Sequence, residues 1–457
     1  MFRDYKVLSY LSRLLKTATA YKAKLLCSGV FVSRRTEAAL LKEDLAVDGL
    51  LPLRLLTSQV DRQNKTVKVS CLGKFESVAL YRPGLGSTLV LGRSVDEVRS
   101  QSSHTEKSQP VSSQNQSLPA AKEIPPEIDA VRLTKAVEGA FVEDSRAFFK
   151  EGAARTRAVV VVHKGVVIAE QYAPGFSAQI PLAGWSMAKS VVNALVGILV
   201  QQGKLSLDSQ DLFPAWRNDS RREITVGHLL RMSSGLTFSE EYGNPFSDVL
   251  TMLFQVGDSA SYAAQRPLQT VPGDTFSYAG GSTVLLCQLI REAVGGELAD
   301  HFSFPRRALF DRIGMTSAVL ESDTAGTFLG SSFMYATARD WAKFGLLYLQ
   351  DGCWDCEGAW QRILPEGWVA YSTAPSAAAD FYGAHFWRGV PNSFTDRGRN
   401  GDGGWPQDAY LAAGFQGQFV TVVPSCELVV VRLGLSQRRN SWDQVRFIEE
   451  MVAAVKG

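Results

Sequence analysis

The chain has 457 residues, 45% of them hydrophobic, and its 48 basic and 46 acidic side chains leave a formal net charge of +2. This length and hydrophobic content allow a full buried core and permit two or three domains. The near balance of charge gives no basic excess of the kind that nucleic-acid-binding proteins carry. We therefore expect a globular protein whose partners do not include nucleic acid.

The first 16 residues form a basic, amphipathic segment. Charged residues divide its apolar positions, so it does not have the pattern of a cleavable secretory signal peptide. Such a segment can lie along a membrane surface or pack as an ordinary helix, and the sequence leaves both alternatives open. The apolar run from Val191 to Val200 is too short to cross a bilayer, so no transmembrane helix is expected.

Residues 1–99 are expected to form an N-terminal accessory region, a helix followed by strands at 66–71, 75–81 and 88–91. We assign it no chemistry. Residues 100–127 are polar and poor in large apolar side chains, which is typical of a linker. The remaining residues, 128–457, are expected to form the main domain.

Within residues 128–457, two hairpins frame the predicted core. Residues 158–172 turn at His163–Gly165, and residues 419–433 turn at Pro424–Ser425. A C-terminal amphipathic helix is predicted over 441–455. Strands from both ends of the domain, with helical segments between them, predict an α+β fold in which helices flank an antiparallel β-sheet.

Ser186-Met187-Ala188-Lys189 opens a long apolar helical stretch that closes at Gly203. Residues three apart lie on the same face of a helix, so the amine of Lys189 can reach the hydroxyl of Ser186 and take its proton. The backbone N–H of Ser186, in the first turn, is suited to an oxyanion. The alternative is a chance S-x-x-K match, since both residue types are common.

Two later segments add to this pattern. Tyr278 ends a loop before an apolar helical run over 283–294, and a tyrosine there can pass a proton to a leaving group. Its alternative role is that of an ordinary core tyrosine. The stretch from Gly414 to Gln418 leads into a predicted strand, and the backbone N–H of Gln418 can supply a second oxyanion donor.

The order Ser186-x-x-Lys189, Tyr278 and a glycine-bearing strand resembles the serine beta-lactamase and penicillin-binding-protein superfamily. The chain is most similar to the class C-like branch that includes esterases, D-amino-peptidases and 6-aminohexanoate-dimer hydrolases. Residues 224–236 and 336–345 resemble connecting segments of that family, and the resemblance covers about residues 128–457. It implies a helical lobe beside the sheet domain.

The resemblance implies a role for each site residue. Ser186 would be acylated, Lys189 would act as its base, and Tyr278 would relay a proton to the leaving group. The backbone N–H groups of Ser186 and Gln418 would form the oxyanion hole. Contacts to a small ester or amide substrate are expected from Tyr242, Gly417 and His385. No cofactor is implied, and the oligomeric state is left open.

Two departures from the family pattern bear on the substrate. Gly280 stands where many relatives have asparagine, and Phe415-Gln416-Gly417 has neither the lysine nor the histidine that usually begins the third motif. A cation there normally grips a substrate carboxylate. Its absence favours an uncharged ester or linear amide. A beta-lactamase, a D-Ala-D-Ala-type peptidase and a penicillin-recognising sensor without turnover remain as alternatives.

The histidines and cysteines point to no further centre. The five histidines show no metal-ligand spacing, so no metal site is expected. Cys353 and Cys356 could close a small loop or stay reduced, and Cys27 and Cys71 could pair, but the spacing does not decide this. The resemblance also implies a location in the cell envelope.

Overall fold

The computed structural model describes residues 2–45, 53, 55–102, 117–142, 154–356, 358–395, 398, 400, 404–436 and 440–457. The chain forms two compact units. Unit 1 contains residues 1–109, 204–304 and 319–333, and unit 2 contains residues 110–203, 305–318 and 334–457. Half of the expected linker, residues 103–116, lies outside the described residues, and the expected domain boundaries stay a prediction.

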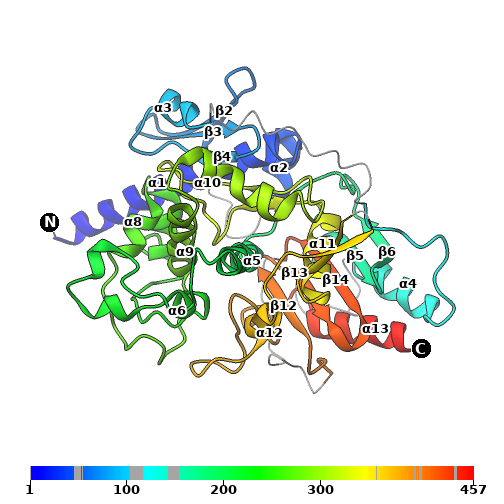
Figure 1. Ribbon diagram of the computed structural model, residues 1–457. Helices are drawn as coiled ribbons and strands as arrows, with labels where there is room; N and C mark the ends of the chain where they lie inside the picture. Colours follow the sequence, from blue (N-terminus) through cyan, green and yellow to red (C-terminus); the bar gives the residue numbers. More distant parts are fainter. Residues whose placement is uncertain are drawn as a thin grey trace. The chain divides into compact units, whose positions relative to one another are not determined.

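The centre of unit 2 is a five-stranded antiparallel sheet (Figure 1). Its strands, in spatial order, are β12 (Tyr410–Gly414), β13 (Gln418–Val423), β14 (Leu428–Gly434), β5 (Thr156–His163) and β6 (Val166–Tyr172). Both expected hairpins are confirmed, as β5–β6 and β13–β14. The two ends of this part of the chain meet where β14 pairs with β5, from Leu428 opposite His163 onward.

Helices cover both faces of this sheet. On one face, Val159, Val161 and Val430 share a core with helices α4 (Ala130–Gly139) and α13 (Gln444–Lys456). Helix α11 (Ala338–Leu349) packs on the other face, where Gly345 lies against Val420 and Val429. Successive strand residues point to opposite faces, so both sets of alternating valines become buried. The expected α+β architecture is confirmed.

Helix α5 (Met187–Gln201) is the apolar helix that the sequence predicts, and all but its last two residues are buried. Gly203, with φ of +67°, follows its C-terminal turn as expected. The other strands and helices of unit 2 are short: β7 (Leu182–Ala183), β9 (Met334–Ala336), β10 (Cys353–Cys356), β11 (Ala359–Arg362), α12 (Trp368–Thr373), a π-helix at Arg306–Phe310 and a 3-10 turn at Pro424–Cys426.

Unit 1 combines the N-terminal region with a set of helices. Helix α1 (Phe2–Phe31) packs against the strands of a four-stranded antiparallel sheet. The strands are β1 (Thr57–Asp61), β2 (Thr66–Cys71), β3 (Phe75–Arg82) and β4 (Gly86–Leu89). The other elements are α2 (Glu37–Glu43), α3 (Val95–Ser100), α6 (Val226–Leu230), α7 (Asp248–Phe254), α8 (Ser259–Ala264), α9 (Gly280–Ala293), α10 (Leu298–Pro305), β8 (Val319–Leu320) and 3-10 turns at Pro214–Trp216 and Ser220–Glu223.

A buried ion pair ties the N-terminal helix to residues nearly 300 positions later. Lys24 of α1 lies 2.6 Å from a carboxylate oxygen of Glu321, and both side chains are fully buried. Glu321 also accepts hydrogen bonds from the Ser28 hydroxyl and the Ser87 backbone N–H. The N-terminal region therefore shares its interior with the segment that follows β8.

Neither disulfides nor membrane-spanning helices are found among the described residues. All six cysteines lie within the described residues and are free thiols. Among the described residues, no helix has the length and apolar character needed to cross a bilayer, and no group of His, Cys, Asp and Glu side chains could hold a metal ion. Tyr10, Leu11 and Leu14 of α1 are exposed, and contact with a membrane surface stays a prediction.

Candidate active site

The first turn of α5 brings Ser186 and Lys189 together. Ser186 is the N-cap residue, and its side chain makes no capping hydrogen bond. Lys189 is 1% exposed, and its Nζ donates a hydrogen bond of 3.0 Å to Ser186 Oγ. The half-buried hydroxyl is thus accessible on one side and held by an amine on the other, the arrangement that a nucleophile with its base requires.

The turn before α5 places this pair. Trp185 has φ of +50°, a left-handed conformation that turns the chain sharply from β7 into the helix. Gly184 just before it donates a backbone hydrogen bond of 2.8 Å to Met334 O of the neighbouring β9. A Cβ at residue 184 would come within 2.3 Å of the Trp341 ring, so only glycine fits there. The start of α5 is therefore fixed by close packing.

The turn between β12 and β13 lies directly beside that of Ser186. A Cβ on Gly414 would come within 2.1 Å of the Gly184 carbonyl oxygen, and the rings of Trp185 and Phe415 meet edge to face at 5.5 Å. Two motifs more than 200 residues apart in the sequence are therefore neighbours. The backbone at Gln418 pairs with Gly414 at the same end of the sheet. The backbone N–H groups of Ser186 and Gln418 stay predicted oxyanion donors.

Buried side chains of β13 and β14 hold the turn between β12 and β13 in place. The Gln418 side chain is 2% exposed; its Nε2 donates to Phe415 O and to Gly434 O, at 3.1 and 2.7 Å, and its Oε1 accepts from Gly434 N at 3.0 Å. Arg432, fully buried, donates to Gly417 O at 2.6 Å. Gly417 has φ of +79° and no room for a Cβ beside Arg432. The sequence indicated only the backbone of Gln418, not this use of its side chain.

His385 lies against α5, but its side chain is 2% exposed. Its carbonyl oxygen accepts a 2.6 Å hydrogen bond from Ser190, the residue after Lys189. Burial, and then the positive charge of Lys189, lower the pKa of His385 well below its usual value, so the imidazole is neutral near pH 7. Contact between His385 and a substrate stays a prediction.

A buried asparagine, for which the sequence suggested no role, fixes the middle of α5. Asn193 donates to Ser372 Oγ and Ala384 O, at 3.0 and 2.9 Å, and its carbonyl oxygen accepts from Tyr348 and Trp368. Every donor and acceptor of this amide is used, which fixes the rotation of the helix. The only sequence signal is a polar residue interrupting an apolar run.

Tyr278 and Tyr242 belong to unit 1. Tyr278 is half-buried, two residues before α9, and its neighbour Ser277 donates a backbone hydrogen bond of 2.8 Å to Met232 O. Tyr242 is 38% exposed, and its hydroxyl donates to Glu240 Oε1 at 3.1 Å. Burial of the hydroxyl, and then the charges of Glu240 and Tyr278, raise the pKa of Tyr242. The two tyrosines are therefore within electrostatic reach of each other.

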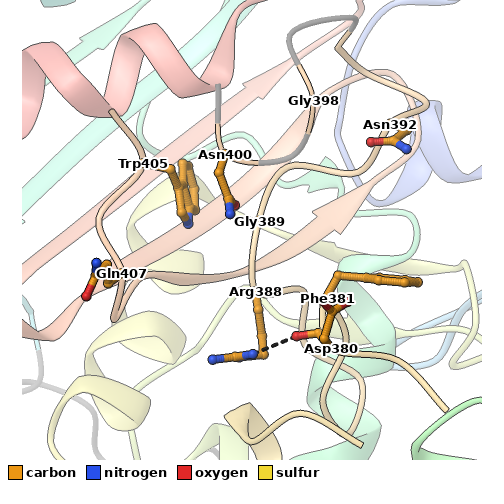
Figure 2. Close-up of a pocket in the computed structure, with 9 residues that line it drawn as sticks. All are labelled: Asp380, Phe381, Arg388, Gly389, Asn392, Gly398, Asn400, Trp405 and Gln407. Carbon is orange, nitrogen blue, oxygen red and sulfur yellow. Dashed lines mark hydrogen bonds between the residues drawn. The ribbon is translucent and has the colours of Figure 1, made fainter. Parts of the chain in front are cut away.

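Unit 2 contains a pocket of about 640 Å³ (Figure 2). In it, Arg388 Nη1 donates a 2.6 Å hydrogen bond to the Asp380 carbonyl oxygen. None of the seven site residues indicated by the sequence is among its described lining residues: Asp380, Phe381, Arg388, Gly389, Asn392, Gly398, Asn400, Trp405 and Gln407.

Comparisons with known proteins identify a family for this chain. The family model described as Beta-lactamase matches residues 140–448. A 6-aminohexanoate-dimer hydrolase of Paenarthrobacter ureafaciens is 25% identical over 225 residues, which are 47% of this chain and 56% of that protein. The match thus spans little more than half the length of this relative.

Solved structures share the fold. A penicillin-binding protein homologue from Caulobacter crescentus has a TM-score of 0.53 at 16% identity and covers 73% of this chain and 99% of its own. A family VIII carboxylesterase has a TM-score of 0.52 at 13% identity and covers 73% of this chain and 98% of its own. At these identities the likeness is one of fold.

Proposed function

Because the chain belongs to the beta-lactamase family of hydrolases, we propose that it is a serine hydrolase that cleaves ester or linear amide bonds of small molecules through a covalent acyl-enzyme. The observation that carries the proposal is the 3.0 Å hydrogen bond between Lys189 Nζ and Ser186 Oγ at the start of a buried helix. A serine hydroxyl is a weak nucleophile unless a neighbouring base takes its proton.

The proposed reaction has two halves. In the first, the Lys189 amine takes the proton of Ser186 as Oγ attacks the substrate carbonyl carbon, and the carbonyl oxygen becomes an oxyanion. The backbone N–H groups of Ser186 and Gln418 hold that oxyanion. When it collapses, the bond to the alcohol or amine breaks, and Tyr278 passes a proton to the leaving group. In the second half, water attacks the acyl carbon and gives a proton to the Lys189 amine; the bond to Ser186 Oγ breaks, Oγ takes a proton back, and the acid leaves.

The charges of two segments support an uncharged ester or amide substrate. Residues 415–417 are Phe, Gln and Gly, so this turn offers no cation to a substrate carboxylate. In unit 1, Glu240 adds a negative charge beside Tyr242. Both features disfavour the carboxylate-bearing substrates that a dedicated beta-lactamase or D-Ala-D-Ala-type peptidase binds.

The names of the related proteins agree in part with this proposal. The sequence relative is by name a hydrolase of a 6-aminohexanoate dimer, and one fold neighbour is by name a carboxylesterase. The match covers little more than half of the relative's length. We therefore treat the relative's substrate only as one compound to test on this protein. We propose Tyr242, Gly417 and His385 as the residues that border the bound substrate.

Intact-mass spectrometry provides the test. The full-length protein is incubated with a fluorophosphonate, the adduct is located by peptide mapping, and the Ser186→Ala variant is the control. A single adduct on Ser186, absent from the variant, is expected. Labelling at another residue would refute the assignment.

Substrate panels then decide the reaction class. Turnover of p-nitrophenyl esters and linear amides is compared with turnover of nitrocefin. Faster turnover of the esters or amides supports the proposal, and a clear preference for nitrocefin identifies a beta-lactamase instead. One equivalent of released product without steady-state turnover would identify a sensor that is acylated but not hydrolysed.

A further inference from the structure

We infer that Glu240 is a positioning residue for the catalytic centre: its carboxylate fixes the backbone that follows Tyr278 and holds the hydroxyl of Tyr242. The predicted effect of Glu240 on kcat rests on the proposed function, whereas the contacts that Glu240 makes do not depend on it. Glu240, Tyr242, Tyr278 and α9 all belong to unit 1, so the contacts that carry it lie within one compact body.

Glu240 caps the helix that follows Tyr278. The N-cap residue of α9 is Ala279, whose side chain has no atom that can accept a hydrogen bond from the first turn. Glu240 Oε2 fills that role from a distant segment, because it accepts a 2.7 Å hydrogen bond from Gly280 N. A carboxylate is favoured at a helix N-terminus by the free N–H groups and by the helix dipole. The position of the Tyr278 backbone therefore depends on Glu240.

The other oxygen of the same carboxylate holds Tyr242. Its Oε1 accepts the Tyr242 hydroxyl at 3.1 Å, so one side chain bridges the loop of Tyr242 and the start of α9. Burial raises the pKa of the Tyr242 phenol, and the negative charge of Glu240 raises that pKa further. A glutamine at position 240 has nearly the same shape, so it could keep part of the hydrogen bonding to Gly280 N and Tyr242, but it would remove the negative charge.

The glycine at position 280 belongs to the same arrangement. A Cβ there would lie 3.3 Å from both carboxylate oxygens of Glu240, tighter than an ordinary contact. The carboxylate can therefore approach Gly280 N closely because residue 280 has no side chain. The cap on α9 therefore requires both the carboxylate of Glu240 and a glycine at position 280.

The first test measures the ionisation of Tyr242 without any substrate. Tyrosine ring carbons are labelled with 13C, and the Tyr242 signal is assigned by its loss in Tyr242→Phe. Glu240→Gln is expected to shift the Tyr242 titration to lower pH, towards the usual value. Glu241→Gln, which changes the adjacent exposed carboxylate, is the matched control and should leave it unchanged. An unshifted titration in Glu240→Gln would overturn the inference.

The second test is kinetic. Glu240→Ala is expected to lower kcat about 10- to 100-fold with a smaller change in KM, because a misplaced catalytic group costs roughly this much. Glu240→Gln should recover part of kcat, since its amide oxygen can still accept from Gly280 N. Equal losses in Glu240→Ala and Glu241→Ala, or a loss in KM alone, would contradict the positioning role.

The two proposals fail in different ways. If the wild-type protein forms no Ser186 adduct, the proposed function fails while the Tyr242 titration still tests Glu240. If Ser186 is labelled but Glu240→Ala has wild-type kcat and circular dichroism, only the role of Glu240 fails. Should Glu240→Ala not fold, Glu240→Gln provides both the titration and the kcat measurement.

Discussion

Gly414 of β12 lies so close to the Gly184 carbonyl oxygen that a Cβ at residue 414 would approach it to 2.1 Å. This contact joins the third motif to the turn that presents Ser186. Gly414→Ala must therefore push the two segments apart. We expect a loss of stability of about 1–3 kcal/mol, as for other overpacked sites, together with reduced kcat.

Urea unfolding and steady-state kinetics measure both effects of Gly414→Ala. Gly243→Ala serves as the stability control, since a Cβ there meets no atom within 4 Å. An unchanged unfolding midpoint for Gly414→Ala would show that the two turns are not in contact in solution.

Removing the amine beside Ser186 should stop acylation. Lys189→Ala leaves the hydroxyl without its 3.0 Å partner, and the acylation rate should fall about 10²–10⁴-fold, the usual contribution of a general base. Ser186→Ala should abolish adduct formation. Lys204→Ala, at an exposed lysine beyond the end of α5, is the matched control. The rate is followed by intact mass, and near wild-type acylation in Lys189→Ala would exclude this lysine as the base.

The proton-relay role of Tyr278 has a separate test. Tyr278→Phe removes only a hydroxyl, so the circular dichroism spectrum should stay the same while kcat falls about 10²–10⁴-fold. Tyr262→Phe is the matched tyrosine variant of unit 1; its hydroxyl donates a 2.6 Å hydrogen bond to Asp248, a structural contact. Full activity in Tyr278→Phe would show that another group delivers the proton.

The Gln418 side chain should affect activity through the shape of the turn. Gln418→Ala removes the hydrogen bonds to Phe415 O and Gly434 O but leaves the backbone N–H in place. We expect a destabilisation of about 1–3 kcal/mol from the unsatisfied buried groups and a kcat loss that exceeds any change in KM. Thermal melts and steady-state kinetics check this. A stable variant with unchanged kcat would show that the turn keeps its shape without this side chain.

Buried His301 should make the protein sensitive to acid. It packs against the rings of Phe302 and Phe328, and within the described residues neither ring nitrogen has a hydrogen-bond partner. Burial, followed by the charge of Arg291, lowers its pKa to about 3. In the unfolded chain the pKa of the His301 imidazole is about 6.5, so below that pH the unfolded state binds one more proton than the folded state. The free energy of unfolding therefore decreases by about 1.4 kcal/mol for each pH unit below about 6.5.

His301→Leu should remove this contribution. The stability difference between the variant and the wild type is measured by urea unfolding at pH 7.5 and pH 5.0. Relative to the wild type, the variant should be about 2 kcal/mol more stable at pH 5.0 than it is at pH 7.5. The same difference at both pH values would show that His301 is not neutral and buried.

Much of the secondary structure followed from local patterns. The strands at 66–71 and 75–82, the hairpins β5–β6 and β13–β14, and helices α5 and α13 all appear where alternation or helical periodicity predicts them. Strand β12 was not predicted, because its Tyr-Leu-Ala-Ala-Gly sequence is short and has no polar alternation. Helix α4 was likewise not predicted, although Asp129 caps its start and Leu133, Ala136 and Val137 form its buried side.

By itself, the sequence determined the pairing of Ser186 with Lys189, because a spacing of three residues places two side chains on one face of a helix. It also determined the order of the motifs along the chain. Only the tertiary structure decided that Gly414 meets Gly184, that Glu240 caps α9 at Gly280 and that Lys24 pairs with Glu321. These contacts join residues from 40 to almost 300 positions apart, and local periodicity carries no information about which distant segments pack together.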